Sequence, residues 1–201
     1  MQASIFRKSS FFIGIPILLF CFVNLSGQGK HTLSNSKSTM SLSGTSSLHD
    51  WIMHSKGFSS ETVFTFDSGK GKELKGIQSL EFSLPAENLK SNKKGLDKNA
   101  YKALKTSQHK NIIYKMKSSK VSHFKGETFL VSAAGNLTIA GVTKLVTLKV
   151  NCTVNADKSI TCSGTQKLKL TDFDITPPSF MLGAMKTGND VVLDFSLIYT
   201  K

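Results

Sequence analysis

Arginine is almost absent from this 201-residue sequence. Arg7 is the only arginine, although 26 basic side chains stand against 13 acidic ones and the net charge is +13. The planar guanidinium of arginine reads guanine edges and clamps phosphates, whereas lysine is a solvated point charge. An arginine-poor basic surface therefore argues against sequence-specific nucleic-acid recognition. The charge is left for solubility or for attraction to an anionic membrane or head group.

Residues that carry chemistry are also few. The chain has five histidines. His49 and Asp50 are adjacent, so in a strand they point to opposite faces and cannot form a simple dyad, and no serine lies in a G-x-S-x-G elbow. His49 and His54 lack companions at metal-ligand spacing. We therefore predict a non-enzymatic protein without a metal or cofactor.

The sequence has one long hydrophobic run, Phe11–Leu25, which follows Arg7 and Lys8 and precedes a small polar stretch. This pattern is typical of a secretory signal peptide. We assign residues 1–29 to the signal and residues 30–201 to one exported domain, with the periplasm as the expected compartment and the extracellular space as the second choice. Two alternatives are an uncleaved anchor and lipidation at Cys21, against which bulky Phe20 argues.

Beyond the signal, only two cysteines remain, Cys152 and Cys162. They flank residues 155–159, which look like a hairpin turn. If Val154 faces Ile160, then Cys152 faces Cys162, close enough for a disulfide in an oxidising compartment. The alternative is two buried free thiols.

The rest of the chain alternates between apolar and polar residues, as half-buried strands do. Three segments alternate most clearly, and five more do so weakly. The clear ones are 146–154, 160–170 and 191–200, and the weaker ones are 40–46, 62–66, 80–84, 112–116 and 129–133.

Only one segment, Leu96–Ser107, has a helical pattern, with Asp97 as a candidate N-cap. Eight or more antiparallel strands with one helical insertion indicate a sandwich or a closed barrel. An eight-stranded barrel has room for one small ligand or is filled by its own side chains. The fold class is therefore all-β.

Three motifs resemble the YceI-like family of exported, lipocalin-like barrels, which hold long-chain amphiphiles such as polyisoprenoids. They are Gly44–Trp51 (GTSSLHDW), Gly135–Lys144 (GNLTIAGVTK) and Leu170–Gly183 (LTDFDITPPSFMLG). The resemblance spans about residues 38–199 and implies an antiparallel up-and-down barrel of about eight strands that binds a lipid. The helical segment departs from the Arg-Asp-x-His-Leu element of other branches, so head-group contacts made there do not carry over.

A lipid carrier needs an apolar tunnel and a mouth. Large apolar side chains on the expected strands and helix are candidates for the tunnel, and the loop 176–186 is the candidate mouth; the alternatives are a solid core and a loop folded back on the barrel end. The tunnel candidates are Trp51, Phe64, Phe66, Tyr101, Leu104, Tyr114, Met116, Phe129, Phe173 and Phe195, and the mouth candidates are Phe180, Met181, Leu182 and Met185.

Seven lysines within 21 residues surround the helical segment, opposed only by Asp97. They are Lys90, Lys93, Lys94, Lys98, Lys102, Lys105 and Lys110. Such a run either draws the barrel mouth toward an anionic membrane or is an ordinary solvated face.

Overall fold

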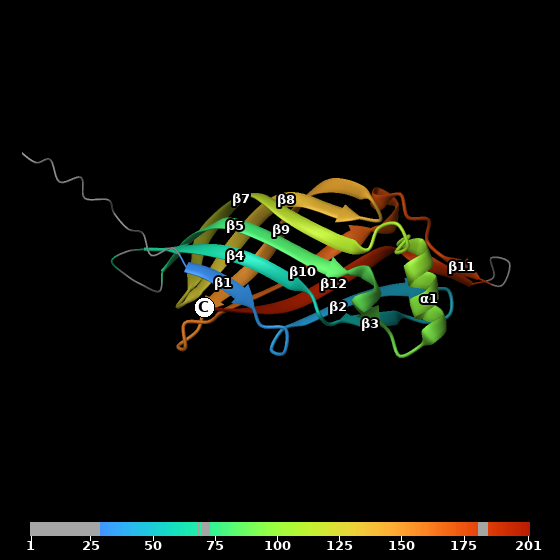
Figure 1. The fold of residues 1–201 in the computed structure, drawn as a ribbon, viewed down its shortest axis with the longest axis horizontal. Helices are drawn as coiled ribbons and strands as arrows, with labels where there is room; N and C mark the ends of the chain where they lie inside the picture. Colours follow the sequence, from blue (N-terminus) through green and yellow to red (C-terminus); the bar gives the residue numbers. More distant parts are fainter. Residues whose placement is uncertain (1–28, 68, 70–72, 181–184) are drawn as a thin grey trace, which may run out of the picture.

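The computed structural model describes residues 29–67, 69, 73–180 and 185–201. The assigned signal peptide, apart from Gly29, therefore lies outside the described residues, as do Met181 and Leu182. The described chain is mostly β-strand (Figure 1). The long strands are β4 (Ser59–Phe66), β5 (Leu74–Pro85), β7 (Asn111–Lys125), β8 (Thr128–Ile139), β9 (Val142–Val154), β10 (Ile160–Lys169) and β12 (Met185–Thr200).

Shorter strands complete the wall. They are β1 (Gly29–Leu33), β2 (Thr39–Ser46), β3 (Trp51–Ser55), β6 (Leu89–Lys90) and β11 (Ser179–Phe180). β1 and β2 both pair with β12, so together they occupy one barrel position interrupted by a turn at 34–38. In the same way β3 pairs with β2, and β4 pairs with β1.

The sheet closes on itself. Neighbours run antiparallel in chain order from β4 through β5, β7, β8, β9 and β10 to β12, and β1 joins β4 to β12. Closure gives each long strand a paired neighbour on both sides, although β9 and β10 pair over only part of their length. The predicted eight-stranded antiparallel up-and-down barrel is thus confirmed, with its strands in sequence order.

The expected helix exists with shifted ends. Helix α1 spans Lys94–Ala103 and lies across one end of the barrel (Figure 1), where it follows the short η1 turn (Ala86–Asn88) and β6. The predicted boundaries of 96 and 107 were wrong. The Asp97 carboxylate does not cap the helix but lies in its first turn, where it accepts bonds from the Ser91 N–H and hydroxyl, both at 2.7 Å. At the other end, Lys105 has a φ of 53° and breaks the helical path.

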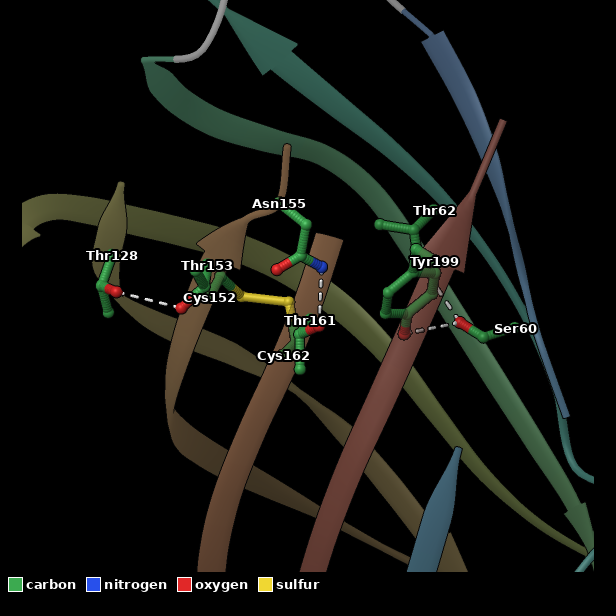
Figure 2. The surroundings of a disulfide bond; sticks show 9 residues. All are labelled: Ser60, Thr62, Thr128, Cys152, Thr153, Asn155, Thr161, Cys162 and Tyr199. Carbon is green, nitrogen blue, oxygen red and sulfur yellow. Dashed lines mark hydrogen bonds between the residues drawn. A yellow bond between two sulfur atoms is a disulfide. The ribbon is translucent and has the colours of Figure 1, made fainter. Parts of the chain in front are cut away.

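At the end opposite α1, Cys152 faces Cys162 in the β9–β10 register, and their sulfurs are bonded. Figure 2 shows polar side chains around this bond. The Thr128 and Thr153 hydroxyls lie 3.0 Å apart, and the Asn155 amide donates to the Thr161 hydroxyl at 2.9 Å. These contacts join β8, β9 and β10 side by side. A disulfide and side-chain hydrogen bonds therefore hold the strands together at this end of the wall.

Tyr199 lies beside the disulfide in Figure 2 and is buried. Its hydroxyl donates to the Ser60 hydroxyl at 3.3 Å, which connects β12 with β4 across the short β1 strand. Burial raises the pKa of the Tyr199 phenol, while its hydrogen bonds with Ser60 and Thr62 act in the opposite direction. Buried, hydrogen-bonded polar groups therefore join β12 to β4 near this end of the barrel.

Candidate functional site

An apolar cavity runs inside the barrel. The volume open to the centre of a water molecule inside this cavity is about 160 Å³. One buried water needs roughly 10–15 Å³ of such volume, so the cavity is more than ten times larger. Its lining reaches from Phe64 and Tyr199 near the disulfide to Leu104 and Phe173 at the α1 end. The cavity therefore extends along much of the barrel interior.

The cavity wall follows the inward phase of the strands. On β8 the buried side chains alternate along the strand, and Val131, Ala133 and Leu137 of this phase all line the cavity. Apart from Gln166 and Lys169, the described lining side chains are aliphatic, aromatic or sulfur-containing. An interior of this kind solvates hydrocarbon and disfavours unpaired polar groups.

The Tyr114 hydroxyl does not break this apolar character. It donates to the Ala133 carbonyl at 2.8 Å, and burial raises the pKa of the phenol to about 12. The ring packs over Gly135, where a methyl group would lie 2.7 Å from Tyr114 Cζ. Gly135, the first residue of the sequence motif 135–144, therefore leaves the space that the Tyr114 ring occupies against the wall.

A short 3-10 turn, η2 (Leu170–Phe173), covers part of the α1 end. Phe173 and Ile175 are each 2% exposed and pack with Tyr114, Leu137 and partly buried Leu104. The turn is held by β12, because Asn189 accepts from the Thr171 N–H at 3.0 Å and donates to the Thr171 hydroxyl at 2.9 Å.

The structure brings some of the sequence candidates together around the cavity and leaves others outside its lining. Phe64, Leu104, Tyr114, Phe173 and Phe195 line it. Five others do not: Trp51, Phe66, Tyr101, Met116 and Phe129. Of the mouth candidates, Phe180 and Met185 are paired in backbone register between β11 and β12, whereas Met181 and Leu182 are not described.

Local contacts explain the positions of two of the candidates outside the lining, Trp51 and Tyr101. Trp51 packs over Gly44 and donates its indole N–H to the Thr45 carbonyl at 3.0 Å. Phe129 is buried but lies outside the cavity wall. Tyr101 points at the chain before α1, where its hydroxyl bonds to the Glu87 and Leu89 carbonyls, both at 2.9 Å.

Sequence reasoning missed the aliphatic part of the wall. Val131, Leu137, Leu148 and Leu168 line the cavity but were not among the candidates. Their signal was present, because each lies on the apolar phase of an alternating strand. The candidates were chosen mainly among aromatic and thioether side chains, that is, by size, and the inward-facing aliphatic side chains were therefore left out.

Within the described parts of the chain, no three His, Cys, Asp or Glu side chains are grouped to hold a metal ion. His49 lies in the exposed turn between β2 and β3, where its carbonyl accepts from the Ser46 hydroxyl at 2.7 Å. The described helices include none with the length and apolar character needed to cross a bilayer.

Comparison with known proteins agrees with this fold. Burkholderia cenocepacia BcnA has a TM-score of 0.65 at 17% identity, covering 84% of this chain and 99% of that one. A polyisoprenoid binding domain from Saccharophagus degradans, implicated in plant cell wall breakdown, has a TM-score of 0.63 at 12% identity, covering 84% and 97%. The YceI protein of Campylobacter jejuni has a TM-score of 0.54 at 20% identity, covering 74% and 84%.

No protein with a curated description matches the chain. The YceI-like domain, however, matches residues 32–199, which include nearly all of the barrel. The predicted resemblance is confirmed by this match over the same strands that enclose the cavity. The chain belongs to the YceI-like domain family.

Proposed function

We propose that the protein is an exported, non-catalytic binding protein for a long-chain amphiphilic lipid, polyisoprenoid or fatty-acid-like, held inside the barrel. The observation that carries the proposal is the apolar cavity of about 160 Å³. The polyisoprenoid binding domain from Saccharophagus degradans has the same fold, which is consistent with a hydrocarbon ligand.

The energetics favour a long chain. Each buried methylene contributes about 0.8 kcal/mol, while association costs roughly 4–15 kcal/mol. A chain of ten or more carbons therefore offsets the cost only when most of it enters the barrel. We propose that Phe64, Leu104, Tyr114, Phe173 and Phe195 contact this tail, because they line the cavity over its whole length.

The loop 176–186 remains the proposed mouth of the barrel. Its described ends, β11 and the start of β12, lie at the α1 end of the barrel (Figure 1). We assign four mouth contacts to this loop, Phe180, Met181, Leu182 and Met185. In this proposal their apolar side chains contact the part of the ligand nearest solvent.

The experiment compares two neighbouring alanines on opposite faces of β8. Ala133 lines the cavity and is 4% exposed, whereas Ala134 is half-buried and lies outside the lining. We expect Ala133→Phe to fill the cavity and abolish the stoichiometric lipid seen by native mass spectrometry and solvent extraction, while Ala134→Phe retains it.

The same pair separates this proposal from its alternative, a structural or interaction protein with a filled barrel. In a filled barrel Ala133→Phe would overpack the core at a cost of about 1–3 kcal/mol, and the parent would carry no lipid. Parent protein that is reproducibly empty, when purified without detergent and then offered long-chain probes, contradicts the proposal.

We further propose transient contact of the α1 end with an anionic membrane. All seven lysines of the run are exposed, and each contributes about 1 kcal/mol near a charged surface. Replacing four of them by glutamine should abolish binding to phosphatidylserine vesicles, and salt should do the same for the parent. Binding that ignores both changes contradicts the membrane contact. The four are Lys93, Lys94, Lys98 and Lys102.

Export to the periplasm is proposed from residues 1–29, which carry the signal-peptide pattern. N-terminal sequencing of protein recovered from a periplasmic fraction tests it. We expect the mature chain to begin near residues 27–29, and an intact Met1 would contradict cleavage.

A further inference from the structure

Strands β9 and β10 separate over half their length. Their register runs from Val154↔Ile160 to Asn151↔Ser163 and stops there, although β9 begins at Val142 and β10 continues to Lys169. Over this same stretch β9 pairs fully with β8 and β10 with β12. The unpaired edges of 142–150 and 164–169 therefore face each other across a seam in the barrel wall.

A surface groove lies along this seam. Its lining combines residues 144–147 of β9 with residues 166–169 of β10, and it extends to Asp172, Phe173 and Asp190. Four residues, Gln166, Leu168, Lys169 and Phe173, line both this groove and the interior cavity. The outer groove and the inner cavity therefore meet at the seam.

The sequence explains why the strands separate here. At Gly164 a side chain would lie 3.0 Å from the Lys149 carbonyl oxygen, so the absence of one lets β10 pass close to β9 and then leave it. Glycine inside a strand weakens pairing and marks a bend. Beyond it, η2 follows β10 directly and covers the α1 end, so the seam lies beside a covered end.

The groove carries charged side chains where the cavity is apolar, with three lysines and two aspartates in its lining. Lys144, the third residue of β9, lies opposite cavity-lining Leu137, so it is on the inward face of the wall, yet it is exposed. Lys167 lies opposite Val192 and is also exposed. Neither has a carboxylate as its cross-strand partner, and neither takes part in an ion pair found among the described residues.

Lys169 differs from these two, because Asp190 is its register partner. Asp172 is the second acidic group of the groove, on η2. Lys144 and Lys167 are thus the two groove lysines whose cross-strand register partners are not carboxylates.

We propose that an anionic amphiphile enters through the seam between β9 and β10, with its tail in the cavity and its phosphate or carboxylate head beside Lys144 and Lys167. This inference rests on the proposed function. It adds a route through the wall and a selectivity for charged over neutral heads.

The first test measures head-group selectivity. Geranylgeraniol and geranylgeranyl diphosphate compete with cis-parinaric acid for the parent, for Lys144→Gln/Lys167→Gln, and for the control Lys117→Gln/Lys120→Gln. The control removes the same charge from exposed positions of β7. We expect the preference for the diphosphate over geranylgeraniol to fall about five-fold in the Lys144→Gln/Lys167→Gln variant and to stay unchanged in the control. This magnitude is that expected for the loss of two exposed charge contacts.

The second test measures the route. Thr147→Cys places a thiol in the groove, and Ser122→Cys places one on exposed β7. Each variant is labelled with the same polyethylene glycol maleimide, and stopped-flow fluorescence follows cis-parinaric acid. The proposed mature chain lacks Cys21, and Cys152 and Cys162 are bonded to each other, so the label goes to the introduced cysteine. A label at 147 should slow association and dissociation by the same factor, several-fold or more, and leave Kd unchanged; the label at 122 should change neither.

The outcomes separate the two proposals. If the parent binds none of the three probes, the proposed function fails. If the probes bind but labels at 147 and 122 give equal rates, the entrance lies elsewhere and the route is wrong. If the groove and control variants show the same diphosphate preference, the two lysines do not hold the head.

Discussion

The close approach of β7 to Gly135 makes Gly135→Ala a sharp test of the barrel wall. The added methyl would lie 2.5 Å from the Lys115 carbonyl oxygen, 2.7 Å from Tyr114 Cζ and 2.8 Å from Met116 Cα. Two of these three atoms belong to the backbone of β7, which is paired with β8 along most of its length and cannot shift by itself.

Overpacking against fixed atoms costs about 2–3 kcal/mol. For a domain of this size we therefore expect Tm to fall by roughly 4–12 °C, with the urea midpoint lowered and the m-value unchanged. Thermal and urea unfolding followed by circular dichroism measure both.

Gly95→Ala is the matched control. Nothing lies within 4 Å of the new methyl, and residue 95 is in the first turn of α1, where alanine is favoured over glycine by up to about 1 kcal/mol. Stability should therefore be unchanged or slightly raised. A Gly135→Ala protein within about 0.5 kcal/mol of the parent would refute the packing argument, since experimental error is of that order.

Three further outcomes follow from the hydrogen bonds and the disulfide. Cys152→Ala/Cys162→Ala should lower the free energy of unfolding by about 2–3 kcal/mol in non-reducing urea titrations, and an unchanged midpoint would show that the bond contributes nothing. The pKa of Tyr114 is raised in the folded protein above the unfolded value of 10.0, so stability that is present below pH 10 is lost as pH rises toward about 12. Tyr114→Phe should therefore reduce the loss of stability between pH 10 and 12. A pH profile identical to the parent's would contradict this. Tyr101→Phe should speed amide exchange in α1 selectively, because the hydroxyl bonds to Glu87 and Leu89 are lost; uniform change over the barrel would argue against a local tether.

Strict alternation was enough to predict the clearest strands. The segments 146–154, 160–170 and 191–200 fall almost entirely within β9, β10 and β12. The weaker segments underestimated strand length, since β7 continues to Lys125 through several exposed lysines and serines. Polar residues do not end a strand when cross-strand hydrogen bonds continue, and these bonds come from partners that a local pattern does not contain.

The site was less predictable than the fold. Phe64, Tyr114 and Phe195 follow from the inward phase of their strands, but Trp51 shares that phase and still lies outside the cavity lining. Its ring is held over Gly44 by the β2–β3 register, which depends on pairing between strands and not on the local sequence. The departure of β9 from β10 has the same origin, because it becomes visible only when two strands are aligned.

The covalent bond between Cys152 and Cys162 limits how far that separation can spread. It lies one residue pair beyond Asn151↔Ser163, where the ladder stops, so fraying that starts at the seam meets a link that thermal motion does not break. Opening and closing of the wall can therefore be frequent without leading to global unfolding. Reduction removes this stop, and fraying can then reach the turn at 155–159. Retention of a guest molecule, and not only the resistance of the fold to denaturant, should then depend on the redox state of the compartment.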